Sequence, residues 1–201
     1  MKRWINAVVA AHAAVFAAVE RATSSWLPGL AARLVFASVL LGYYWNSALT
    51  KVGSGLAGLF PVADNAYYQI APHIIEAAGY DVSNVAVFPW KIIVHAGTYA
   101  EFLLPLAVTL GLFARLAALG MTGFILVQTL VDITLHKIGA EATGSFFDRF
   151  PDAMIADQRL LWLFPLLYLV VKGAGLVSVD ALLVRLWKPA APTGRATPLP
   201  A

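Results

Sequence analysis

Long apolar runs alternate with shorter polar segments along most of this chain. A helix needs about 20 residues to cross the roughly 30 Å hydrocarbon layer of a membrane. Four runs reach that length, so the pattern predicts an all-α protein, a bundle of four transmembrane helices over residues 29–50, 90–114, 115–136 and 160–183. The second and third runs are joined by little more than Phe113-Ala114-Arg115, which predicts a tight antiparallel hairpin.

The first 26 residues form a separate segment in front of this membrane domain, which we place at residues 27–187. Apolar residues recur in the segment at helical spacing: Ile5, Val8, Val9, Phe16 and Val19, with His12 on the same face. This spacing predicts an amphipathic helix lying at the membrane interface, with a fifth span as the alternative. The segment imitates a signal peptide, but Asn6 and His12 interrupt its apolar core, so we expect it to be retained.

Two more segments lie outside the spans. Residues 71–79 read as a short helix that begins at Pro72 and ends at Gly79, and we expect this piece of the long 51–89 connection to cap the bundle. Residues 188–201 are rich in Pro and Gly and predict a disordered tail.

Composition supports a membrane protein. The 201 residues are 60% hydrophobic and 12% charged, whereas average globular proteins have about 25% charged residues. The net charge of +3 does not indicate a nucleic-acid partner, because the basic residues are scattered at segment ends. Without cysteine the chain can form no disulfide and no thiolate metal site. Its first partner is therefore the lipid bilayer.

The basic residues also predict orientation. One side of the predicted spans carries Lys2, Arg3, Arg21, Arg33, Arg115, Arg185, Lys188 and Arg195. The other side has fewer cations, and acidic residues dilute them. By the positive-inside rule, both termini should be cytoplasmic.

Glu101 lies near the middle of an otherwise uncharged run and needs a partner, a proton or a function. Counted along the spans, Glu101 lies about 16 Å below Trp90, and Lys172 about 18 Å below Leu160. The equal depth predicts an intramembrane ion pair between Glu101 and Lys172. The alternative is that each side chain snorkels or pairs elsewhere, with Arg33 or Arg115 as other partners for the acid.

Other polar residues converge on the outer half of the predicted bundle. His95 and Tyr99 share one helix face, as do Asp132 and His136, and Asn46 lies at a similar level. With Glu101 these residues predict a pocket for a quinone headgroup, a proton path, or a His/carboxylate metal site. We assign no metal ligand, because a His and an Asp at helical spacing more often form a hydrogen-bonded pair.

At the inner face, Arg33, Arg115 and Asp180 lie at one level, which predicts a clamp between Asp180 and an arginine. The sequence around these residues includes Arg33-Leu34-Val35, Gly111-Leu112-Phe113-Ala114-Arg115 after Glu101, and a Gly-x-Gly-x-x-Ser-x-Asp ending at 173–180. Together they resemble the DoxX family of small bacterial membrane proteins over residues 33–183. The resemblance implies a four-helix bundle in the bacterial cytoplasmic membrane and an association with membrane redox chemistry.

Three functions are compatible with these features. The first is a non-catalytic accessory or anchor subunit of a redox-linked, quinone-associated complex, with a membrane or periplasmic protein partner. The second is a quinone-binding or proton-relay oxidoreductase subunit, in which quinone would be the cofactor. The third is a small-solute or metal transporter, which is weakened because four unbroken helices leave little room for alternating access.

Overall fold

The computed structural model describes residues 2–187, and the tail expected at 188–201 lies outside them. The described part is helical and contains no β-strand, which confirms the all-α class. Its elements are α1 (Lys2–Thr23), α2 (Leu27–Phe36), η1 (Ala37–Leu41), α3 (Gly42–Leu49), α4 (Gly55–Gly58), α5 (Asn65–Ile70), α6 (Pro72–Ala77), η2 (Val82–Asn84), η3 (Val87–Lys91), α7 (Ile92–Leu110), α8 (Ala114–Thr134), α9 (Ala140–Thr143), η4 (Met154–Arg159), α10 (Leu160–Lys172) and α11 (Val179–Trp187).

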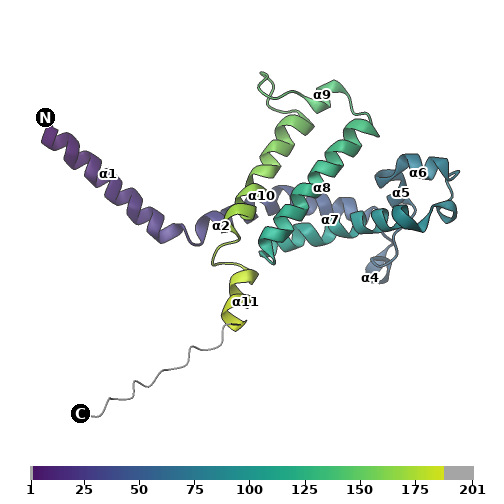
Figure 1. Ribbon diagram of the computed structural model, residues 1–201, viewed down its shortest axis with the longest axis horizontal. Coiled ribbons are helices and arrows are strands. Elements are labelled where there is room, and N and C mark those ends of the chain that lie inside the picture. Colours follow the sequence, from purple (N-terminus) through teal and green to yellow (C-terminus); the bar gives the residue numbers. More distant parts are fainter. Residues whose placement is uncertain (1, 188–201) are drawn as a thin grey trace, which may run out of the picture.

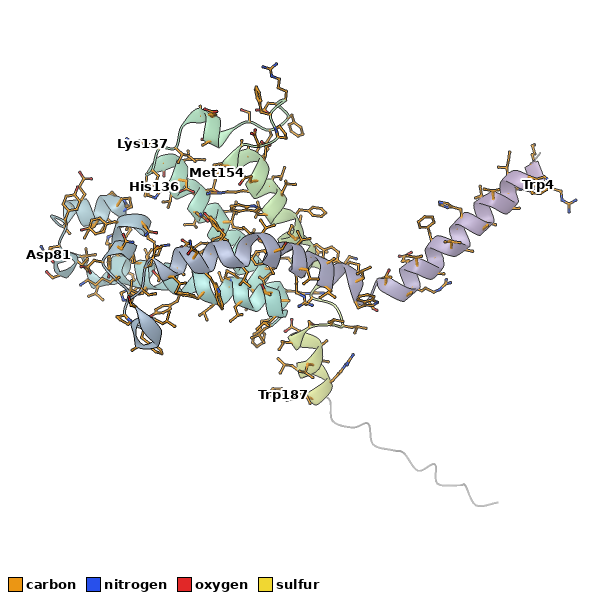
Figure 2. All side chains as sticks on the ribbon, turned by 180° about the vertical axis from the view of Figure 1, so that it is seen from behind. Trp4, Asp81, His136, Lys137, Met154 and Trp187 are labelled. Carbon is orange, nitrogen blue, oxygen red and sulfur yellow. The ribbon has the colours of Figure 1, made fainter. Side chains whose placement is uncertain are left out.

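Five helical stretches among the described residues are long and apolar enough to cross a membrane: Lys2–Thr23, Leu27–Leu49, Val87–Leu110, Ala114–Thr134 and Met154–Lys172. The last four overlap the expected spans. The first is α1, which has no buried residue and extends away from the other helices, with Trp4 at its far end (Figures 1 and 2). These helices confirm a membrane protein with several apolar spans.

The four central stretches pack side by side around one apolar core. The stretch Leu27–Leu49 consists of α2, η1 and α3 and contacts both α7 and α10, and α8 contacts the same two helices from the other side. Their shared core consists of Phe36, Leu40, Tyr44, Val108, Ala117, Ala118, Met121, Ile125, Leu166 and Leu169. In water, burial of apolar side chains is the main favourable term in folding. Inside lipid, close packing between the helices takes that role.

Residues 51–86 cover one end of the bundle, which we call the cap end (Figure 1). In this cap, α5, α6 and the following turn bury Ala66, Tyr67, Ala71, Ile75 and Val85 against Val94 of α7. Val94 is fully buried. One face of the first turns of α7 therefore packs against the cap.

The opposite end, which we call the turn end, holds the tight connection between α7 and α8. Gly111 ends α7 with a left-handed φ of 68°. The amide of Leu112 donates to the Ala107 carbonyl at 2.9 Å, and that of Gly111 to the Val108 carbonyl at 3.2 Å. This is a Schellman ending, which satisfies carbonyls that the end of the helix leaves free. It produces the predicted hairpin.

The fourth span ends earlier than the predicted limit of residue 183. α10 stops at Lys172, because Gly173 adopts a φ of 83° and Gly175 a φ of 78°. A new helix, α11, follows from Val179, and the Ser178 hydroxyl accepts from the Ala181 amide at 3.2 Å near its start. Gly173 and Gly175 thus interrupt the predicted fourth span.

Candidate functional site

Lys51 and Glu101 form an ion pair at the cap end of the bundle. Lys51 follows α3, and its Nζ donates to Oε2 of Glu101 on α7 at 2.8 Å. The same Nζ donates to the Ser47 hydroxyl at 2.7 Å and to the Ser47 carbonyl at 3.2 Å. The Lys51 side chain is 3% exposed and that of Glu101 is 9% exposed. Charges so far removed from water need each other, since either alone would carry an uncompensated desolvation cost.

The expected ion pair between Glu101 and Lys172 is therefore wrong. Lys172 is exposed and is the last residue of α10, at the turn end. Glu101 lies about 14 Å from the turn end when the rise along α7 is counted to Leu110. The prediction placed Lys172 in the middle of a longer helix, and the break at Gly173 removes that premise.

A second ion pair joins Arg159 to Asp132. Arg159 ends the π-helical segment η4 and donates through Nη2 to the carboxylate of Asp132 on α8. Its Nη1 donates to the Thr129 hydroxyl, one turn earlier on α8, at 2.7 Å. Arg159 is 4% exposed. No role was predicted for Arg159 from the sequence. Its position directly before the apolar run that begins at Leu160 was the one indication that it could be buried.

A pocket of about 650 Å³ lies between the two ion pairs, bounded by α7, α8, the end of α3 and the cap. It is lined by three of the predicted site residues, Glu101, Asp132 and His136. Lys51 and Gln128 line it as well, and neither was assigned to the site from the sequence. Gln128 accepts from the Tyr44 hydroxyl at 2.9 Å, which fixes its amide inside the bundle.

The cap closes over this pocket through polar contacts. Asn65 donates to the Thr50 carbonyl at 2.9 Å, and the Gln69 amide donates to the Thr50 hydroxyl at 3.1 Å. Nε2 of His136 lies 3.2 Å from the Gln69 carbonyl, and Figure 2 shows His136 at the end of α8. The expected segment 51–89 thus supplies both a lysine to the site and its cover.

Three other predicted site residues lie outside the lining of this pocket. His95 is exposed; its Nδ1 is 2.7 Å from the Lys91 carbonyl and its ring packs edge-on to Tyr67. Burial, and secondarily the charge of Asp64, raises the pKa of the Tyr67 phenol. Tyr99 donates to the Phe60 carbonyl. Asn46 is exposed. His95 and Tyr99 therefore contact cap residues and lie outside the lining of the pocket that contains Glu101.

The structure brings Arg33 and Asp180 to the turn end as predicted, but it makes no ion pair between Asp180 and an arginine among the described residues. The Asp180 carboxylate accepts from the amides of Phe113 and Ala114 at 2.6 and 2.8 Å and so caps α8. Arg33 donates to the Thr109 carbonyl at 2.8 Å and to the Val177 carbonyl. Backbone groups near the ends of α7 and α8 and in the loop before α11 thus bind both charged side chains. Arg115 is exposed.

Hydrogen-bond donors and acceptors line the pocket together with apolar residues. Within residues 2–187 no group of three His, Cys, Asp or Glu side chains is placed to hold a metal ion. The pocket can hydrogen-bond a small polar headgroup through Gln128 or His136. Comparison with protein-family models, curated proteins and solved structures found no match for this chain.

Proposed function

We propose that this chain is a DoxX-like membrane protein of the bacterial cytoplasmic membrane that acts as an accessory or anchor subunit of a redox-linked, quinone-associated complex. In this proposal four helices cross the membrane, both termini are cytoplasmic, and α1 lies at the inner interface. The observation that carries the non-catalytic role is the Lys51–Glu101 pair at 2.8 Å. Two mutually neutralised, buried charges join helices, and neither is free to exchange a proton with a substrate.

An accessory subunit needs a surface for its partner, and the loop between α9 and η4 offers one. Phe146, Phe147 and Phe150 of this loop are all exposed. Exposed aromatic side chains are typical anchors of protein interfaces. They belong to the loop that leads into η4, which a periplasmic partner would approach in the proposed orientation.

The test is affinity purification of the full chain from its own membrane in a mild detergent, followed by native mass spectrometry. We expect a redox subunit to co-purify with the native chain. The triple variant Phe146→Ser, Phe147→Ser, Phe150→Ser should lose that partner while its thermal unfolding midpoint stays unchanged. A chain that is isolated alone, from cells whose quinone-dependent respiration does not change when the gene is deleted, would refute the proposal.

The pocket of about 650 Å³ favours quinone binding as a second candidate. In it, His136 would donate to a quinone carbonyl. Quinone analogues should then raise the unfolding midpoint of the native chain, and His136→Ala should abolish that rise. An analogue that stabilises both proteins equally would exclude binding at this pocket.

A further inference from the structure

A second cleft, distinct from the pocket under the cap, lies between the helical stretches Leu27–Leu49 and Met154–Lys172. It has a volume of about 970 Å³ and is lined on one side by α2, η1 and Tyr43 of α3, and on the other by η4 and α10. Its lining reaches from Pro28 to Tyr43, which corresponds to about 22 Å of helix. This length covers most of the hydrocarbon layer, so the cleft suits a long chain that runs along the helices.

Both helices that form the cleft depart from α-helical geometry where they line it. The π-helical segment η1 contributes Val39 and Leu40, and the π-helical segment η4 contributes Met154, Gln158 and Arg159. Each π-helical turn gives up regular hydrogen bonding, and such turns occur frequently at functional sites. Two of them facing one cleft indicate that its shape is maintained at a cost.

The cap end of the cleft holds a buried arginine with an unused donor. Arg159 is 4% exposed, and its terminal nitrogens are taken by Asp132 and Thr129. Its Nε has no hydrogen-bond partner among the described residues. A buried N–H without a partner is costly and rare in native proteins. The remaining N–H of Arg159 can bind an acceptor at this end of the cleft once the side chain shifts to expose it.

Charge decides which acceptor fits. The positive charge of Arg159 is already matched by Asp132, so the pair is neutral as a whole. An anionic headgroup would add an unmatched negative charge beside Asp132 in a medium of low dielectric constant, whereas an uncharged carbonyl needs only the hydrogen bond. We propose that this cleft is a binding site for an uncharged, single-chain lipid whose carbonyl accepts from Nε of Arg159. This proposal is independent of the redox role.

The test uses the full chain in detergent micelles and a photoactivatable monoacylglycerol as the probe. Crosslinks should map to residues 28–43 and 154–168, and unlabelled monoolein should displace the probe at about tenfold lower concentration than oleate, which has the same chain and an anionic head. Crosslinks spread over all lipid-facing helices, or equal competition by monoolein and oleate, would overturn the proposal.

Neighbouring residues on α2 supply a matched pair of variants. Val35 lines the cleft and is 55% exposed, whereas Leu34 does not line it and is 59% exposed. Val35→Trp fills the cleft and should abolish specific crosslinking, and Leu34→Trp should leave it intact. The same loss in both variants, or in neither, contradicts the proposal even if variants of Arg159 fail to fold.

The headgroup preference gives a further readout. Asp132 lines the pocket under the cap and not the cleft. Asp132→Asn leaves the cleft lining unchanged but removes the charge that matches Arg159. The preference should therefore invert, with oleate now the better competitor. Retention of the monoolein preference in this variant would show that Arg159 does not determine which headgroup binds.

Discussion

The Lys51–Glu101 pair allows a quantitative test of how its charges act. Glu101→Gln keeps the volume of the side chain and removes its charge, and Lys51→Met does the same for the lysine. Glu101→Gln leaves Lys51 with the two Ser47 acceptors at 2.7 and 3.2 Å. Lys51→Met removes the one hydrogen bond that the Glu101 carboxylate accepts within the described residues. We therefore expect Lys51→Met to be the more destabilising change.

The magnitudes follow from burial. Removing one member of a buried pair costs about 3–5 kcal/mol, because the other charge stays desolvated. We expect about 3 kcal/mol for Glu101→Gln and about 5 kcal/mol for Lys51→Met. For a chain of this size these values lower the thermal midpoint by roughly 6–12 °C and 10–20 °C. The double variant Lys51→Met, Glu101→Leu replaces the pair by apolar groups and should lie within about 1 kcal/mol of the native chain.

The assay is unfolding of the purified chain in a mild detergent, followed by tryptophan fluorescence during heating and by circular dichroism during titration with a denaturing detergent. Lys172→Met is the matched control, because it makes the same substitution at an exposed lysine. It should leave both transitions unchanged. If Lys172→Met were as destabilising as Lys51→Met, or if the double variant were as unstable as Lys51→Met alone, the pairing argument would be refuted.

Three further substitutions test other contacts by the same unfolding assay. Asp180→Ala removes the cap from two amides of α8 and should cost about 1–2 kcal/mol; an unchanged midpoint would contradict the capping role. Gly111→Ala should destabilise by more than about 1 kcal/mol, because its φ is 68° and a Cβ would lie 2.8 Å from that of Ser178. Gly123→Ala, where a Cβ meets nothing within 4 Å, should be neutral or stabilising, so equal effects at the two glycines would refute this reading. Tyr44→Phe should cost about 1 kcal/mol by leaving the Gln128 carbonyl without its donor, and no change would show that water replaces it.

The helical class and the central spans could be predicted from the sequence because apolar runs of membrane length are a strong local signal. The tight turn at Gly111 was equally local. The end of the fourth span was not, because Gly173 and Gly175 are compatible with either a close helix contact or a break. The structure shows the break, with the Leu176 amide donating to the Ser25 carbonyl at 3.0 Å. That long-range contact has no counterpart in the local pattern.

The candidate site was predicted only in part, for one geometric reason. Depth was counted from Trp90 as though the membrane began there, but Val94 is buried among cap residues. The cap therefore packs against one face of the first turns of α7, and Glu101 lies level with the end of α3, where Lys51 follows. Asp132 of α8 and His136, just beyond its end, both line the pocket.

The two ion pairs differ in which cavities their members line. Lys51 and Glu101 both line the pocket under the cap, so their charges cancel within a single cavity. Asp132 lines that pocket, whereas Arg159 lines the cleft between Leu27–Leu49 and Met154–Lys172. The Arg159–Asp132 pair thus lies between two cavities, and the Thr129 hydroxyl of α8 also accepts from Nη1 of Arg159. A ligand that draws Arg159 toward the cleft must weaken its hold on Asp132, and a ligand that binds Asp132 in the pocket must change the donor left for the cleft. Linkage makes this effect reciprocal, so occupancy of one cavity should alter affinity in the other by the same factor in both directions.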